Sequence, residues 1–288
     1  MQKQIINEQE ICTWQEFVHL KKDVINSTQM LYRGLPNPPR KSKKENWKPY
    51  DLKTTYQRRY QSPDISNFYH KLEDFQKHQN KYFTLKKIRD IGDKNNLISL
   101  VLYLRHVGIP MPVLDVTYNP LTALYFSVYN LYDQYGVVDS FDSINKLNEC
   151  GYVSIIEFNI DILENYYNVI ELDAINNFQE IIDDRIFFIK NFDELPFENK
   201  NMNLQDGAFI FLSSSKSIDL ILRKQESRSL ESLPTPIIHY RISYSSIFDD
   251  NSKENIYSYL ERKGKIGHNM FCDDQALLFD FLNPSFNI

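Results

Sequence analysis

Glycine is scarce in this sequence, with 8 residues in 288. The chain contains neither a G-x-G-x-x-G nor a G-x-x-x-x-G-K pattern, the glycine-rich loops with which dinucleotide-binding and P-loop proteins cradle phosphates. The scarcity of glycine therefore argues against a phosphate-cradling loop of either kind.

Cysteine is also rare, and the three residues Cys12, Cys150 and Cys272 are far apart. Their odd number and the absence of a C-x-x-C pair argue against a disulfide framework and against a zinc site. Such spacing favours buried, reduced thiols in a cytoplasmic protein.

Long apolar runs are absent as well. No stretch approaches the roughly 20 apolar residues that a membrane span requires. The segment 11–18 is interrupted by polar residues and does not resemble the apolar centre of a secretory leader. We therefore expect no membrane partner.

Charge is distributed unevenly along the chain. Residues 1–110 contain 20 Lys and Arg against 11 Asp and Glu, whereas residues 111–288 contain 13 against 27. The net charge of the whole chain is −5. A basic first part of this kind is compatible with a surface that binds a polyanion.

The pattern of apolar residues predicts one α+β domain spanning residues 1–288, with helices mainly in the first half and a mostly antiparallel sheet region in the second. A capping box formed by Thr13 and Glu16 begins a helix within the N-terminal segment 1–28. Asn119 followed by Pro120 predicts another helix start. Further helices are expected at 66–90, 97–106, 252–263 and 273–282, and strands at 29–32, 152–158, 169–172, 207–212 and 237–242.

Four short blocks of sequence stand out. They are Tyr32-Arg33-Gly34, the stretch from Leu104 to Phe126 that contains Arg105-His106-Val107-Gly108-Ile109-Pro110 and Leu114-Asp115-Val116-Thr117, the stretch Gln205-Asp206-Gly207-Ala208-Phe209, and Met270-Phe271-Cys272-Asp273. In this order and spacing the blocks resemble the FRG-domain family, which is named after an aromatic-Arg-Gly tripeptide, over about residues 30–280. The chain departs from the family pattern at Val116 (usually Trp), at Met111 and Pro112 (usually Thr-Arg) and at Cys272 (usually Pro).

This resemblance implies a toxin or phage-defence effector, and a toxin implies an antitoxin or inhibitory partner. An aromatic-Arg-Gly tripeptide on an early strand also resembles ADP-ribosyltransferases, whose first-strand arginine grips the cofactor. Such an enzyme would use NAD as a substrate and transfer ADP-ribose to RNA or to a protein.

The chemistry of ADP-ribosyl transfer suggests a role for each residue of these blocks. Arg33 would bind the NAD pyrophosphate, with Tyr32 and Gly34 beside the cofactor. His106 would orient a ribose hydroxyl or transfer a proton, and Asp115 or Gln205 would stabilise the oxocarbenium-like transition state. ADP-ribosyltransferases carry a glutamate on a late strand, and this chain has Gln205-Asp206 instead.

Each of these residues also has a structural interpretation. Arg33 and Asp115 would form an ion pair that holds the blocks together, and His106 would cap the end of a helix. Gln205 would bond to the backbone, and Asn119 would be an N-cap.

A basic, aromatic segment at 37–62 is predicted to be a long loop. Residues 33–59 contain nine Lys and Arg and two acids, and Tyr50 and Tyr56 lie among them. Nucleic-acid contacts are predicted for Lys41, Lys43, Lys44, Trp47 and Lys48, because cations meet phosphates and aromatic rings stack on unpaired bases. A solvated basic loop is the alternative.

Two other functions stay open. Acidic residues gather at 171–194, but their spacing matches no metal-ligand set, so no metal site is predicted, and a nuclease would have to be built differently. The chain could also be a partner-binding module without catalysis.

Overall fold

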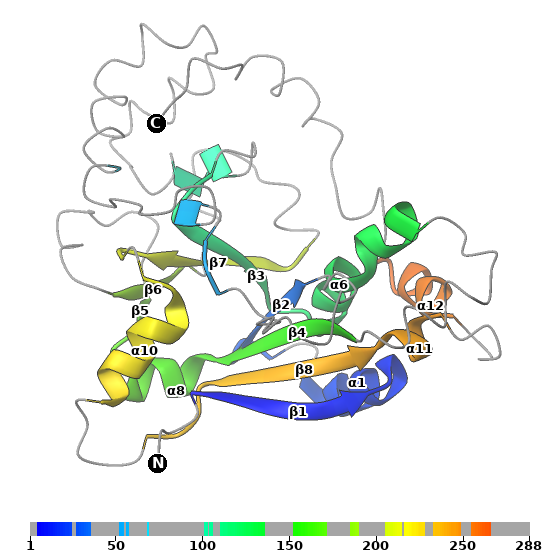
Figure 1. Cartoon of the computed structure of the whole chain (residues 1–288), viewed down its shortest axis with the longest axis horizontal. Coiled ribbons are helices and arrows are strands. Elements are labelled where there is room, and N and C mark those ends of the chain that lie inside the picture. Colours follow the sequence, from blue (N-terminus) through cyan, green and yellow to red (C-terminus); the bar gives the residue numbers. More distant parts are fainter. Residues whose placement is uncertain are drawn as a thin grey trace, which may run out of the picture.

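A mixed eight-stranded sheet forms the centre of the molecule (Figure 1). The computed structural model describes residues 5–24, 27–35, 52–54, 56–57, 68, 101–102, 104–105, 110–135, 152–171, 185–189, 205–214, 216–227, 233–248 and 255–265. The strands are β1 (Ile6–Cys12), β2 (Met30–Leu35), β3 (Val113–Thr117), β4 (Tyr152–Asn159), β5 (Ile170–Glu171), β6 (Ile186–Ile189), β7 (Gly207–Leu212) and β8 (Ile237–Ser243). Their spatial order is β1-β8-β4-β2-β3-β7-β6-β5.

Most neighbouring strands in this sheet are antiparallel. The pairs β1–β8 and β5–β6 are parallel, and the other pairs run in opposite directions. The described helices are α1 (Trp14–Lys21), η1 (Lys22–Val24), α6 (Pro120–Tyr135), α8 (Ile160–Tyr166), α10 (Ile218–Glu226), α11 (Tyr244–Ile247) and α12 (Ile256–Arg262). The predicted α+β class is confirmed, with strands and helices in both halves of the chain.

Two helix starts follow the sequence closely. Thr13 and Glu16 form the predicted capping box, in which each side chain bonds to the backbone of the other residue. At the start of α6 the Asn119 Oδ1 atom accepts from the Leu121 N–H at 2.9 Å, which is the N-cap that Asn119-Pro120 predicts.

Several expected elements need correction or fall outside the described residues. The N-terminal segment contains β1 before its helix, residues 113–117 form a full strand, and β6 is an additional strand. Val101, Leu102, Leu104 and Arg105 are helical, and the first three are buried, in agreement with the helix expected at 97–106. The helix predicted at 273–282 and nearly all of that predicted at 66–90 lie outside the described residues.

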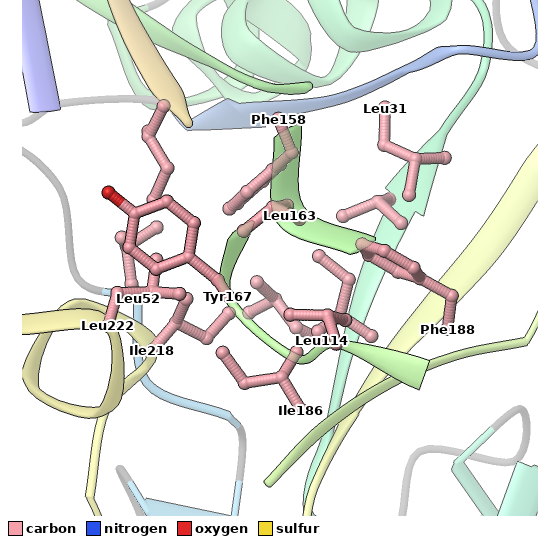
Figure 2. Close-up of a cluster of buried hydrophobic side chains, with 14 of the residues drawn as sticks. Leu31, Leu52, Leu114, Phe158, Leu163, Tyr167, Ile186, Phe188, Ile218 and Leu222 are labelled. Carbon is pink, nitrogen blue, oxygen red and sulfur yellow. The ribbon is translucent and has the colours of Figure 1, made fainter. Parts of the chain in front are cut away.

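Alternate residues of the central strands enter two different cores. On one face Tyr32, Val153 and Ile242 pack with side chains from α1, α6, α11 and α12. On the other face Leu31, Phe158 and Leu114 pack with residues of α8 and α10 (Figure 2). The sheet is therefore covered on both faces, and a residue at an adjacent position of β2 faces the opposite core.

Gly34 allows β2 to lie against the backbone of α6. A Cβ atom at this position would overlap the carbonyl oxygen of Ala123 and come within 2.7 Å of the Ser127 nitrogen. Backbone atoms in a helix cannot move aside as a flexible side chain could. The absence of a side chain at Gly34 therefore allows β2 to pack closely against α6.

We expect Gly34→Ala to lower the free energy of unfolding by about 3 kcal/mol, because the added methyl forces β2 and α6 apart. Urea denaturation would measure the change. Gly264→Ala is the matched control: its backbone has a φ of +67°, but nothing lies within 4 Å of the added Cβ. That variant should lose only about 1 kcal/mol, from left-handed strain. Equal losses would contradict the packing role of Gly34.

Candidate functional site

The sheet opens between its two middle strands. β2 and β3 are paired at a single position, Tyr32 opposite Thr117. By contrast, β2 is paired with β4 along its whole length, and β3 is likewise paired with β7. Figure 1 shows β3 and β7 turning away from β2, β4 and β8. Arg33, Gly34 and Leu35 thus border a place where the backbone ladder is interrupted.

Arg33 reaches across this opening to Asp115. Its Nη1 atom donates to the backbone carbonyl of Asp115 at 2.5 Å and lies 3.9 Å from the Asp115 Oδ2 atom. The side chain of Arg33 is 11% exposed and that of Asp115 is 41% exposed. The ion pair that the sequence offered as a structural alternative is therefore present, but its carboxylate is open to solvent.

A second guanidinium meets the same carboxylate. The Nη2 atom of Arg105, which lies in a helical turn preceding β3, forms an ion pair with Asp115 Oδ2. The Nε atom of Arg105 is buried without a hydrogen-bond partner. Arg105 belongs to a block that the sequence singled out, but its position in an apolar run concealed its role. The only sequence signal for a role of Arg105 was the presence of a charged residue in a segment expected to be buried.

The arrangement has a definite electrostatic consequence. Two guanidinium groups share one carboxylate, so these three side chains carry a net positive charge. Arginine presents planar donors that match phosphate oxygens, and a partly buried site strengthens such bonds relative to water. The charges and donors of these three side chains are therefore compatible with an anionic ligand beside a carboxylate.

The neighbours of Arg33 in the tripeptide have structural contacts. The Tyr32 side chain is fully buried, so only its backbone is left for the predicted contact with a cofactor. Burial, followed by the nearby charge of Glu157, raises the Tyr32 pKa well above its usual range. Gly34 faces α6, as described above.

Gln205 lies near the site, at the turn that precedes β7. The Thr117 hydroxyl lies 2.6 Å from the Gln205 carbonyl oxygen and 3.0 Å from that of Asp206. Asn119 donates to the Asp206 carboxylate at 2.9 Å. These bonds tie the end of β3 and the start of α6 to β7. The backbone carbonyl of Gln205 thus contacts Thr117, which lies two residues along β3 from Asp115, whereas the roles expected of the Gln205 side chain stay predictions.

The remaining predicted residues lie outside the described part of the chain. They are His106 and the proposed nucleic-acid contacts Lys41, Lys43, Lys44, Trp47 and Lys48. Tyr56, by contrast, is buried with its ring centroid 4.7 Å from that of Phe68, so the expectation that it stacks on bases is wrong.

Behind Tyr32 lies a buried ion pair that the sequence did not reveal. Lys21 of α1 forms a salt bridge with Glu157 of β4 and donates to the Tyr240 hydroxyl at 2.8 Å. The Lys21 and Glu157 side chains are 9% and 5% exposed. Burial, with the charge of Glu157, raises the Tyr240 pKa above its usual range. This network joins α1 to the middle of the sheet.

On the opposite face, Ser154 and His239 form a Ser–His pair, with 2.7 Å between Oγ and Nε2. Both residues are fully buried, so no substrate reaches them. Burial, assisted by the charge of Arg241, lowers the His239 pKa to about 4, so the imidazole is neutral at pH 7. The pair is a packed polar contact between β4 and β8.

The described residues contain no group of three or more His, Cys, Asp or Glu side chains that could hold a metal ion. Within the same residues, no helix is both long and apolar enough to cross a bilayer.

The fold and the site define an α+β protein in which two arginines meet one aspartate where the ladder between β2 and β3 is interrupted. Residues 28–135 match the family model of the FRG domain. The matched segment contains β2, β3 and α6, together with Arg33, Arg105 and Asp115, so the part of the chain that carries the site is similar to FRG domains. The blocks at Gln205 and at Met270–Asp273 lie beyond this match.

No curated protein matches the chain, and no solved structure matches it. These comparisons give no support to the likeness to ADP-ribosyltransferases, which stays a prediction.

Proposed function

We propose that this protein is a toxin or defence effector that transfers ADP-ribose from NAD to a macromolecule. The observation that carries the proposal is the convergence of Arg33 and Arg105 on the half-exposed carboxylate of Asp115, at the point where β2 and β3 diverge. This geometry supplies the cation and the carboxylate that the reaction requires.

The two guanidinium groups would bind the pyrophosphate of NAD. A pyrophosphate carries two negative charges, and the two guanidinium groups supply two positive charges to pair with them, so both arginines are needed; the Asp115 carboxylate then leaves one negative charge in excess. Arg33 is held by the Asp115 carbonyl and Arg105 by the Asp115 carboxylate. Donors fixed in advance lose little conformational entropy when a ligand binds.

Asp115 would act on the ribose. In the transfer, the bond between C1′ of the ribose and the nicotinamide nitrogen breaks, and nicotinamide leaves with the electron pair. The acceptor nucleophile then forms a bond to C1′ and loses its proton to solvent or to a nearby base. A carboxylate stabilises the positive charge that develops on the ribose, as carboxylates do in glycoside cleavage.

The proposal is tested by incubating the purified full-length protein with NAD labelled in its adenylate half, together with cell RNA or cell protein. We expect nicotinamide release and label that remains with the macromolecules after washing. Nuclease and protease digestion would identify the acceptor. A folded protein that leaves NAD intact in both mixtures would remove the enzymatic proposal and favour a binding module.

A further inference from the structure

A single pair of residues joins the two halves of the sheet. β1, β8, β4 and β2 form one run of neighbouring strands, and β3, β7, β6 and β5 form the other. In the described strands, the ladder between β2 and β3 consists of Tyr32 opposite Thr117. The direction in which β3 continues toward Asp115 is therefore set at this pair, which we refer to as the joint.

The hydroxyl of Thr117 holds the joint on the side of β3. It lies 2.6 Å from the carbonyl oxygen of Gln205 and 3.0 Å from that of Asp206, and it accepts from the Asn119 N–H at 3.0 Å. One small group thus bonds both to the turn before β7 and to the start of α6. Thr117 is buried, and polar groups that lose a bond away from water pay the cost of their desolvation.

The turn that meets this hydroxyl is itself held in place. Asp206 has a left-handed backbone with a φ of +47°, and its carbonyl accepts from the Tyr118 N–H at 2.9 Å. Its carboxylate accepts from the Asn119 side chain at 2.9 Å and from the Lys265 ammonium at 2.7 Å. The Thr117 hydroxyl therefore bonds to a fixed support.

The side of the joint that belongs to β2 is equally well fixed. The Tyr32 side chain is fully buried, and Tyr32 is paired with Glu157 in the ladder between β2 and β4. The Lys21 ammonium, which forms a salt bridge with Glu157, lies 5.7 Å from the centroid of the Tyr32 ring. A change at the joint would therefore move β3 rather than β2.

Small rotations at the joint are enlarged at Asp115. Asp115 lies two residues from Thr117 along β3, which is about 7 Å of strand, so a rotation of about 10° would displace it by about 1 Å. Arg33 donates to the Asp115 carbonyl at 2.5 Å and lies 3.9 Å from its carboxylate. A displacement of this size would break that bond.

We propose that Thr117 is a positioning residue of the candidate site. Through its hydroxyl it sets the angle at which β3 leaves β2, and thereby the place of Asp115 between the guanidinium groups of Arg33 and Arg105. The consequence for ADP-ribosyl transfer rests on the proposed function, whereas the effect on the two arginines does not.

The first measurement follows the two arginines without NAD, by heteronuclear NMR of the isotopically labelled full-length protein. A guanidinium held by hydrogen bonds rotates slowly and gives separate Nη signals, whereas a released one gives averaged signals. We expect separate signals for Arg33 and Arg105 in the wild type, assigned with Arg33→Lys and Arg105→Lys, and averaged signals in Thr117→Val. Thr117→Ser, which keeps the hydroxyl, should restore the separate signals. Thr117→Ala removes the same hydroxyl and replaces the valine variant if that variant does not fold.

The second measurement is nicotinamide release. Thr117→Val should lower kcat/KM by at least about 10-fold, because a displacement of about 1 Å at a reacting group can cost about 10²-fold in rate. Thr117→Ser should stay close to the wild type. A wild-type protein that releases no nicotinamide would defeat the proposed function, while the spectra would still decide the role of Thr117.

The matched control is Thr122→Val. Thr122 is fully buried in α6, and its Oγ1 atom has no hydrogen-bond partner within the described part of the chain. The control makes the same exchange of a hydroxyl for a methyl group and should leave the arginine signals and the rate unchanged. Averaged arginine signals in the wild type or in Thr122→Val, or separate signals in Thr117→Val, would overturn the proposal.

Discussion

Replacing Arg33 by lysine is expected to lower the rate of nicotinamide release by about 100-fold. Lysine keeps the positive charge but loses the planar group that bonds the Asp115 carbonyl while facing the opening of the sheet. Removing one hydrogen-bond donor that is already oriented toward a charge on the substrate lowers the reaction rate by about 10²–10³-fold. Steady-state nicotinamide release with saturating NAD would measure the effect, and circular dichroism would show that the fold is retained.

Arg262→Lys is the control for this change. Arg262 is an exposed arginine of α12 whose guanidinium carbon lies 5.6 Å from the Tyr259 ring centroid, far from the opening between β2 and β3. This variant should keep the wild-type rate. If Arg33→Lys also kept it, charge alone at this position would suffice, and the geometric role of the guanidinium would be refuted.

The second large effect is expected on stability. Glu157→Ala should lower the free energy of unfolding by about 4 kcal/mol, because it leaves the Lys21 ammonium buried without its carboxylate. The Tyr240 hydroxyl cannot compensate for the missing charge. Chemical denaturation followed by tryptophan fluorescence would measure the loss, since Trp14 lies on the same helix as Lys21.

Two further variants show whether the loss comes from an uncompensated charge. Lys21→Met combined with Glu157→Leu should recover most of the stability, because apolar side chains of similar volume often replace a buried ion pair without loss. Lys265→Ala, which breaks the more exposed pair with Asp206, should cost no more than about 1 kcal/mol. A double variant as unstable as Glu157→Ala would show that packing, not charge, is responsible.

Local sequence signals predicted much of the secondary structure correctly. The capping box at Thr13 and the helix start at Asn119-Pro120 could be predicted because each depends only on neighbouring residues. The strands β4, β7 and β8 are rich in β-branched and aromatic residues and were placed within one residue of their ends.

Strands that depend on distant partners were missed. β1 is an edge strand with the polar sequence INEQEIC, and its identity as a strand comes from its parallel pairing with β8, more than 200 residues away. β6 has four apolar residues after an acidic stretch, and it becomes a strand between β7 and β5. Neither segment has the length or alternation that marks a strand by itself.

At the candidate site, too, the sequence predicted some residues and missed those that depend on distant partners. The sequence identified Arg33 and Asp115 as related residues, through their blocks, and also offered their ion pair as an alternative. The sequence did not identify Arg105 as the second cation of the site, because a charged residue within an apolar helix does not indicate which residue it pairs with. Lys21 and Glu157 had no local signal at all, since their pairing spans 136 residues.

The sequence alone thus determined the helix caps, the main strands, the α+β class and the two blocks that meet at the site. Only the tertiary structure decided that β2 and β3 part after one residue pair, that two guanidinium groups share Asp115, and that Leu52 and Gln57 bond to the chain at and just before the start of α10. The physical reason is that caps and periodicity depend on bonds over three or four residues, whereas these contacts join residues 10 to 166 positions apart (218 − 52 = 166). Such contacts form only when burial of two apolar faces brings distant segments together.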